Sequence, residues 1–202
     1  MTPPGKKTRV AILISGSGSN MEALLEDMAA PGHPGEPALV LSNREDAAGL
    51  AKAQARGVPA AVVPHKGRPR AAFEAQLAAE LARARAELIC LAGFMRILTP
   101  GFVQRRAGRI LNIHPSLLPL FPGLDTHAQA LAAGVAIHGC TVHEVTPELD
   151  AGPILGQAAL AVRPEDTPET LAARLLPLEH RLYPQVLRAR LSGEAGPIAL
   201  FA

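Results

Sequence analysis

Short apolar runs alternate with amphipathic segments over the first 114 residues. Five apolar runs predict buried strands, and the segments between them have the spacing of helices with one buried face. The strands are expected at residues 9–15, 38–42, 60–63, 88–91 and 109–114, and the helices at residues 19–30, 46–56, 70–86 and 100–106. This alternation predicts a parallel sheet with right-handed crossovers.

The pattern changes after residue 114. A short helix is predicted at residues 127–133, followed by strands at 138–145 and 154–162 that we expect to form an antiparallel pair. Thr167-Pro168 begins the last helix with an N-cap and a proline at its first position. Its apolar stripe consists of Leu171, Leu175, Leu178, Leu182 and Val186, and prolines at 177 and 184 predict a kink or break.

The sequence also predicts where the first helix starts and which terminal residues are loose. Ser19 and Glu22 have the spacing of a capping box, so the first helix is expected to start there. We expect residues 1–8 and 193–202 to be loose termini of one domain that spans residues 1–202.

Composition limits the class of protein. A chain of 202 residues with 48% apolar residues can bury the core of a single domain. The net charge of +2, only one tyrosine and no tryptophan give no support to nucleic-acid binding. No apolar run is long enough to span a membrane, and the start does not resemble a signal peptide. The two cysteines, Cys90 and Cys140, lie in apolar runs, as expected of small buried side chains in a reducing compartment. The sequence thus predicts a cytoplasmic protein that binds neither nucleic acid nor membranes.

The first candidate for chemistry lies at the end of the fifth predicted strand. Asn112 and His114 alternate along that strand, so they face the same side, and Pro115 and Pro119 follow them. The carboxyl end of a parallel strand is where open α/β sheets bind ligands. An amide can stabilise an oxyanion and an imidazole can transfer a proton, which suits acyl transfer. The alternative is a polar strand end capped by prolines.

The second candidate is a glycine-rich turn. Gly16-Ser17-Gly18 separates the first strand from the first helix, but Met21 stands where a dinucleotide fingerprint has its third glycine. No acidic residue closes the second strand, so a lone phosphate on the backbone N–H groups of Gly18, Ser19 and Asn20 fits better than NAD. An ordinary tight turn is the alternative.

Two further segments are ambiguous when taken alone. Residues 92–98, Ala-Gly-Phe-Met-Arg-Ile-Leu, follow the fourth strand and could form a slot for a flat heterocycle or pack beneath a loop. Asp150 could raise the pKa of His114 and fix its tautomer if it reached the imidazole, or it could be a simple turn residue.

A metal site and a serine hydrolase are poorly supported. His138, Cys140, His143 and Glu144 are potential ligands, but they lack the spacing of known zinc motifs. The serines near residue 17 lack a complete nucleophile elbow. We therefore expect no metal.

Taken together, the glycine loop, LAGFMRIL, NIHPSLLP, PGLDTH and HGCTVHEVTPELDAGP resemble the folate-dependent phosphoribosylglycinamide formyltransferases over about residues 9–190. The resemblance implies a single-domain, Rossmann-like three-layer α/β sandwich whose mostly parallel sheet carries an added C-terminal antiparallel strand pair. It also implies formyl transfer from 10-formyltetrahydrofolate, a co-substrate, to the amine of N1-(5-phospho-D-ribosyl)glycinamide in purine biosynthesis. The partners implied are these small molecules, for a monomer or a homodimer.

The same resemblance assigns site residues. Its catalytic residues correspond to Asn112, His114 and Asp150. Its ribonucleotide contacts correspond to Gly18, Ser19, Asn20, Leu176, Pro177, Leu178 and Glu179. Its folate contacts correspond to Arg70, Met95, Arg96, Ile97, Leu98, Asn112, Thr146, Pro147, Glu148, Leu149 and Asp150. The chain departs from the family pattern at Ser17, Leu120, Thr141 and Pro177.

Three alternatives differ in function. A formyltetrahydrofolate hydrolase would pass the formyl group to water, but that relative usually has an extra N-terminal domain, for which a first strand at residue 9 leaves no room. Formyltransferases acting on aminoacyl-tRNA or nucleotide sugars share His-Pro-Ser-Leu-Leu-Pro but lack the Gly-Ser-Asn loop. A non-catalytic folate- or nucleotide-binding regulator would be expected to have lost one of the three catalytic residues, all of which are present.

Overall fold

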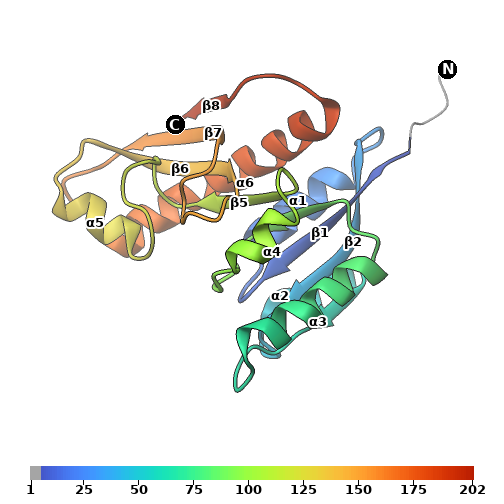
Figure 1. Cartoon of the computed structure of the whole chain (residues 1–202). Helices are drawn as coiled ribbons and strands as arrows, with labels where there is room; N and C mark the ends of the chain where they lie inside the picture. The colour runs from blue at the N-terminus through green and yellow to red at the C-terminus, as the bar shows by residue number, and fades with distance from the viewer. Residues whose placement is uncertain (1–5) are drawn as a thin grey trace. The chain divides into compact units, whose positions relative to one another are not determined.

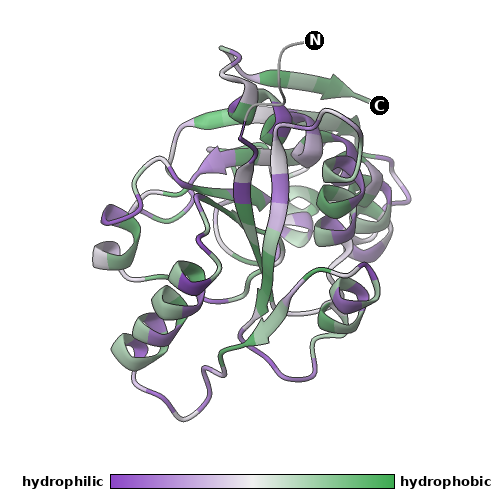
Figure 2. Ribbon diagram, turned by 90° about the vertical axis from the view of Figure 1, so that its right-hand side faces the viewer, coloured by the Kyte–Doolittle hydropathy of each residue, from purple (hydrophilic) through white to green (hydrophobic). Residues whose placement is uncertain are grey.

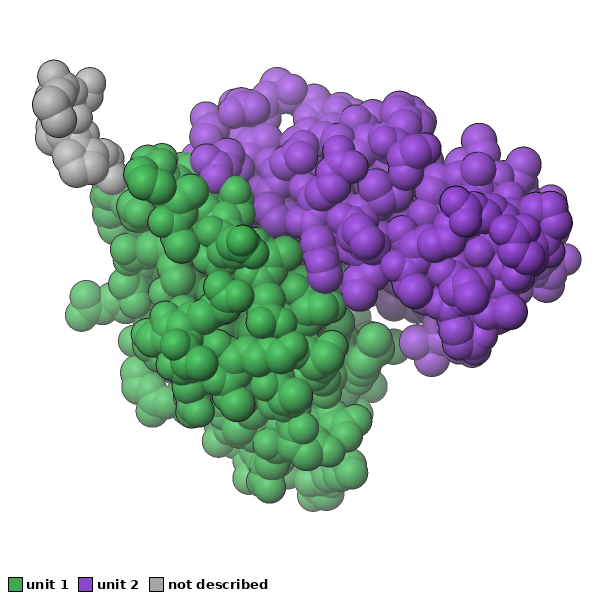
Figure 3. Space-filling model, turned by 180° about the vertical axis from the view of Figure 1, so that it is seen from behind, with its two compact units in different colours: residues 1–111 green, residues 112–202 purple. Residues whose placement is uncertain are grey.

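The computed structural model describes residues 6–202, and their contacts divide the chain into two compact units. Unit 1 ends at Leu111 and unit 2 runs from Asn112 to Ala202, as the green and purple surfaces of Figure 3 show. The expected loose N-terminus lies outside the described residues over positions 1–5. The rest of that segment is ordered, because Lys6 pairs with Glu87 and Thr8 begins the first strand.

Unit 1 alternates strands and helices (Figure 1). Its elements are β1 (Thr8–Ile14), α1 (Ser19–Met28), β2 (Gly35–Ser42), α2 (Ala48–Ala55), β3 (Ala60–Val62), α3 (Arg70–Arg83), β4 (Leu88–Leu91) and α4 (Pro100–Gln104). The strands lie in the order β3-β2-β1-β4, and every pairing among them is parallel. The parallel α/β arrangement predicted from the apolar runs is confirmed.

The strand order reverses at β1. The chain passes from β1 to β2 and β3, then returns to β4 on the other side of β1. Right-handed crossovers therefore place α3 on the opposite face of the sheet from α1 and α2. Covered on both faces, β1 has no exposed side chain from Val10 to Ile14. The helices carry green and purple turns side by side in Figure 2, as expected when only one face of each is buried.

Unit 2 contains the antiparallel pair. The last residues of β5 (Ile110–His114) belong to it, and the other elements are α5 (Thr126–Ala132), β6 (Ile137–Glu144), β7 (Ile154–Ala161), α6 (Pro168–Ser192) and β8 (Ile198–Phe201). The strand order continues β5-β6-β7-β8, with β6 and β7 antiparallel as predicted.

The predicted break in the last helix is wrong. α6 continues through Pro177 and Pro184, each of which lacks one N–H donor. All five members of its predicted apolar stripe are buried, and Gly156 of β7 lets Val186 and Leu182 approach closely. Tertiary packing of this stripe therefore outweighs the missing backbone hydrogen bonds. No helix in residues 6–202 combines the length and the apolar character needed to cross a membrane.

The expected loose C-terminus is also wrong. Residues 198–201 form β8, which pairs in parallel with β7 from Gly156↔Ile198 to Ala159↔Phe201. Gly193 ends α6 in a left-handed conformation and allows the chain to turn back toward the sheet. The apolar segment Ile-Ala-Leu-Phe then completes an edge that β7 would otherwise expose.

The predicted start of α1 at Ser19 is confirmed, but the capping box that suggested it is wrong. The N-cap is Gly18 in a left-handed conformation, and no side chain caps the helix. Ser19 is thus already inside the helix and cannot serve as its cap. The tight turn needed after β1 determines this start, because the turn requires a positive φ that glycine tolerates best.

The segment that follows β5 is fixed by buried hydroxyl groups. Thr126 Oγ1 donates to the carbonyl of Pro115 at 2.6 Å, and Thr141 Oγ1 donates to that of Ser116 at 2.7 Å. Further along, the rings of His127 and His138 meet with Nδ1 and Nε2 3.1 Å apart. Burial, followed by the charge of His127, lowers the pKa of His138 to about 4. His138 is therefore neutral in the folded protein at neutral pH.

We expect this histidine to make the fold sensitive to acid. Between the unfolded pKa near 6.5 and the folded pKa of about 4, the unfolded chain binds a proton that folded His138 does not. Its contribution to stability is therefore complete above about pH 6.5 and declines as the pH falls toward 4. The free energy of unfolding can be measured with urea at pH 7 and at pH 4.5. Its decrease between these two pH values should be ~1–2 kcal/mol smaller in His138→Gln than in the parent chain. Equal losses in the two proteins would contradict this assignment.

Candidate active site

The carboxyl ends of β1 and β4 meet at the switch point of unit 1, where such sheets bind ligands. The N–H of Ser15 donates to the carbonyl of Gly93 at 3.1 Å, and the N–H of Met95 donates to Ser15 Oγ at 2.7 Å. The Ser15 hydroxyl in turn donates to Asn43 Oδ1 at 2.6 Å. The predicted phosphate loop and the predicted heterocycle loop are therefore tied together by one buried serine.

The glycine loop is shaped by a close approach of two backbones. Gly18 has a φ of 74°, and a Cβ there would lie 2.9 Å from the Cα of Gly49. Gly49 N–H also donates to the carbonyl of Gly16 at 3.1 Å. Because the N-cap is a glycine, no side chain there covers the first N–H groups of α1, which include those of Ser19 and Asn20. This arrangement suits an anion.

The loop after β4 presents apolar side chains to solvent. Met95 and Ile97 are 71% and 60% exposed, whereas Leu98 is buried. Arg96 lies with its guanidinium carbon 6.0 Å from the centre of the Phe73 ring, and its buried Nε has no hydrogen-bond partner among residues 6–202. Arg70, at the start of α3, is exposed one turn before Phe73. Exposed apolar groups beside an unpaired buried donor are the features of a ligand-binding surface.

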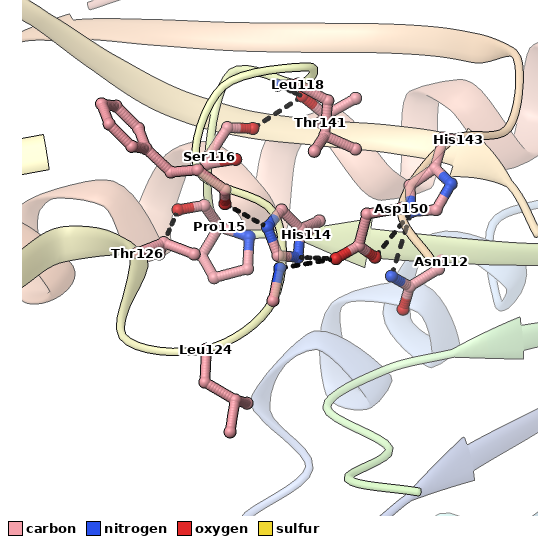
Figure 4. Close-up of polar contacts among 12 residues, drawn as sticks. Asn112, His114, Pro115, Ser116, Leu118, Leu124, Thr126, Thr141, His143 and Asp150 are labelled. Atoms are coloured by element: carbon pink, nitrogen blue, oxygen red, sulfur yellow. Dashed lines mark hydrogen bonds and ion pairs between the residues drawn. The ribbon is translucent and has the colours of Figure 1, made fainter. Parts of the chain in front are cut away.

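In unit 2, the structure brings the three predicted catalytic residues together (Figure 4). His114 Nδ1 lies 3.5 Å from Asp150 Oδ2, and both side chains are more than 90% buried. Asp150, in the connection between β6 and β7, has a φ of 50°, and its Oδ2 also accepts a hydrogen bond at 2.9 Å from the N–H of Gly123. The connection thus turns sharply to bring a carboxylate onto the strand's imidazole.

A fourth residue, His143, joins the cluster. Its Nε2 lies 3.1 Å from Asn112 Nδ2 and 3.8 Å from Asp150 Oδ1, while its Nδ1 lies 2.9 Å from the carbonyl of Glu144. From the sequence, His143 was expected only as a potential metal ligand. Its position on β6 next to β5 could have indicated this contact, because a polar residue on a buried strand needs a partner on its neighbour.

The contacts of His143 define its tautomer. A carbonyl only accepts, so Nδ1 carries the proton and donates to Glu144, and Nε2 accepts from the Asn112 amide. Burial is the main cause that lowers the pKa of His143, which favours this neutral form. The Asn112 amide nitrogen has a second N–H, which this contact leaves available for another acceptor.

His114 is held differently. Its Nε2 lies 3.0 Å from the carbonyl of Phe121, so the proton on this nitrogen is donated to the carbonyl. Its Nδ1 faces the Asp150 carboxylate. The ring is thus oriented by the Phe121 carbonyl on one side and by the Asp150 carboxylate on the other.

The other predicted contacts in unit 2 lie on the β6–β7 connection and α6. Thr146 is half-buried, and Pro147, Glu148 and Leu149 are exposed. On α6, Leu178 is buried within the apolar stripe. Its neighbours Leu176 and Glu179 are half-buried, and Pro177 is exposed. These residues lie in the same unit as the cluster, and the Gly18–Asn20 and Met95–Leu98 loops lie in unit 1.

Metal-ligating groups were also sought in the structure. Among residues 6–202, no set of three or more histidine, cysteine, aspartate or glutamate side chains is arranged to hold a metal ion. His138 and Cys140, two of the four potential ligands considered from the sequence, are buried on β6.

Comparison with known proteins places these features in one family. The sequence profile described as formyl transferase matches residues 8–187. The phosphoribosylglycinamide formyltransferase of Escherichia coli is 42% identical over 88% of this chain and 84% of its own length. The trifunctional purine biosynthetic protein adenosine-3 of Bos taurus is 46% identical over 93% of this chain, which spans only 19% of that protein.

Solved structures agree with the sequence relatives. The phosphoribosylglycinamide formyltransferase of Brucella melitensis has a TM-score of 0.88 and 52% identity, covering 95% of this chain and all of that one. A formyltetrahydrofolate deformylase from Pseudomonas syringae has the same TM-score of 0.88, but it is 29% identical and this chain covers 63% of it. The predicted fold class is confirmed by these neighbours, and the extent of the match shows that the chain belongs to the formyl transferase family.

Proposed function

We propose that the chain transfers a formyl group from 10-formyltetrahydrofolate to the amine of N1-(5-phospho-D-ribosyl)glycinamide. The products are N2-formyl-N1-(5-phospho-D-ribosyl)glycinamide and tetrahydrofolate, and the step belongs to purine biosynthesis. The observation that carries this proposal is the buried His114–Asp150 pair, linked through His143 to the amide of Asn112. Two relatives that match 88% and 95% of the chain, at 42% and 52% identity, are named phosphoribosylglycinamide formyltransferase.

In the proposed reaction, the substrate amine attacks the formyl carbon and forms a tetrahedral intermediate with a negatively charged oxygen. Asn112 stabilises this oxyanion with the N–H that does not contact His143. His143 contributes by fixing the amide orientation, since the Asn112 nitrogen must donate to a neutral Nε2. A fixed donor of this kind is typically worth about a hundred- to a thousand-fold in rate.

Proton transfer completes the reaction. The attacking amine loses a proton and the departing folate nitrogen gains one, so the formyl group moves without a net change in protons. His114 carries the proton between them, which requires one ring nitrogen to exchange its present partner, Asp150 or the Phe121 carbonyl, for the substrate. Asp150 stabilises the imidazolium. No nucleophilic side chain takes part, and no metal is required.

Substrate binding is proposed for both units. In unit 1, the backbone of Gly18, Ser19 and Asn20 binds the phosphate, and Arg70 with the loop from Met95 to Leu98 binds the folate. In unit 2, Asn112 and residues 146–150 bind the folate, and residues 176–179 bind the ribonucleotide. The unpaired Nε of Arg96 supports the folate assignment, because a buried donor without a partner is stabilised when a ligand accepts its proton.

We further propose that residues 1–202 work as one formyltransferase domain in the cytoplasm, as a monomer or a homodimer. The match to the family profile supports one domain, since it crosses the boundary between the units without interruption.

A two-substrate assay tests the activity. Tetrahydrofolate release from 10-formyltetrahydrofolate should require the phosphoribosylglycinamide and should proceed without added metal, since the His114–Asp150 pair supplies the proton transfer. The control omits the ribonucleotide. Equal release without it would establish the hydrolase alternative instead, and folate binding with no release under either condition would favour a regulator.

Replacing the imidazole tests its role. His114→Ala should lower turnover by about a hundred-fold or more, because general acid–base catalysis is typically worth that much. The parent melting temperature should be largely retained, and His127→Gln, which changes a histidine outside the proposed site, serves as the matched control. Turnover near that of the parent chain in folded His114→Ala protein would eliminate this role.

The carboxylate is tested by the pH dependence of the rate. Asp150→Asn should lower turnover and move the midpoint of the pH–rate profile that depends on His114 to lower pH. The reason is that removing an adjacent negative charge destabilises the imidazolium. A profile that is lowered but not shifted would argue against coupling between the two side chains.

A further inference from the structure

A pocket lies in unit 1, among the C-terminal part of α3, the start of β4 and the segment after α4. Its volume is about 260 Å³. One wall is apolar and includes Leu81 and Ile89 with several alanines, and the other carries Arg105, Arg106 and Arg109. A pocket of this size suits a small molecule with one charged and one apolar part.

The three guanidinium groups form no salt bridge with an acidic side chain of the described residues, although the charge of Glu74 partly offsets that of Arg106. None of them forms an ion pair with another residue of the described chain, 6–202. The one carboxylate that lines the pocket, Glu87, is engaged by Lys6 at 3.0 Å and by the N–H of Arg9 at 3.0 Å. The pocket is therefore positively charged.

Contacts within the protein explain how two of these arginine side chains are held, but not why three positive charges lie together. Arg109 donates to the carbonyl of Arg105 at 2.9 Å, and Arg106 stacks 3.8 Å from the centre of the Phe102 ring. These contacts hold the side chains but neutralise no charge. Burial first, and then the positive charges of Arg105 and Arg109, lower the pKa of Arg106, as expected for like charges held close together. A bound anion would relieve this repulsion.

Within unit 1, the pocket is separate from the loops assigned to the proposed active site. Glu87 and Ile89 lie at the amino end of β4, whereas the loop from Met95 to Leu98 follows its carboxyl end. Gly18 follows the carboxyl end of the parallel neighbour β1, so it lies at the same end of the sheet as that loop.

We propose that Arg105, Arg106 and Arg109 form a binding site for a small phosphate monoester whose organic part packs against Leu81 and Ile89. Guanidinium groups match phosphate oxygens through paired charge-assisted hydrogen bonds. The apolar wall favours a monoester with a compact apolar group over inorganic phosphate.

Phenyl phosphate is a suitable probe, with inorganic phosphate and phenol as its two halves. In amide NMR spectra of the full chain at constant ionic strength, we expect saturable shifts at Ala82, Ala86 and Ile89. Arg105→Gln/Arg109→Gln should weaken this binding by about tenfold or more, since the double variant removes two donors of charge-assisted hydrogen bonds to the phosphate. Arg83→Gln is the matched control, because it removes an exposed arginine of α3 that does not line the pocket. It should leave the affinity within about twofold.

Arg105→Gln alone provides a second test, because its side chain is exposed. It should weaken binding measurably with no change in melting temperature. The proposal is overturned if the shifts are confined to residues 18–20, grow linearly without saturation, persist unchanged in both variants, or occur equally with phenol. Because the experiment contains no folate and measures no turnover, its failure leaves the formyl-transfer proposal unaffected.

Discussion

The Asp150 carboxylate is the contact on which the proposed site depends. One of its oxygens accepts from the Gly123 backbone and faces His114, and the other lies 3.8 Å from His143. His143 in turn determines which atom of the Asn112 amide donates. Two residues of β5, one of β6 and one of the β6–β7 connection are thus linked through a single negative charge. A buried carboxylate with fewer partners would be strongly disfavoured. Loss of any one of these contacts should therefore destabilise the arrangement of the others.

Backbone strain lies in the segment that follows β5 and in the β6–β7 connection, the two segments that position His114 and Asp150. Among the four described residues other than glycine with positive φ, Phe121, Asp125 and Asp150 have values of 54°, 55° and 50°. Phe121 offers its carbonyl to His114, and Asp150 offers its carboxylate to the same ring. Left-handed conformations cost roughly 1–3 kcal/mol for such residues and persist only where neighbouring contacts determine them. The Thr126, Thr141 and Gly123 hydrogen bonds provide those contacts, so the imidazole is oriented before any substrate binds.

The sequence was most informative where one local rule decided the structure. Apolar runs located β1 through β7 to within about three residues, and the alternation of strand and helix predicted the parallel sheet. Prediction from the sequence failed where tertiary contacts determined the structure. α6 tolerates Pro177 and Pro184 because its leucine stripe packs on β7, and β8 forms because β7 offers an unpaired edge. At the site, the shared face of Asn112 and His114 followed from strand geometry. The approach of Asp150 came only from the family resemblance, and His143 was missed because no local pattern links β5 to β6.

The two charged sites of this chain illustrate different uses of the same fold. In unit 2, the Asp150 carboxylate accepts from the Gly123 backbone and faces the His114 imidazole, which suits a proton-transferring group that must return to its starting state after each turnover. At the arginine pocket of unit 1, three arginines lie together, and the backbone and ring contacts that hold two of them, Arg109 and Arg106, do not neutralise their charge. A protein gains no stability from keeping like charges together without a counter-ion. The scaffold that holds the arginines is therefore best explained by the anion that they would bind, just as the strain around His114 is best explained by the proton that it would transfer.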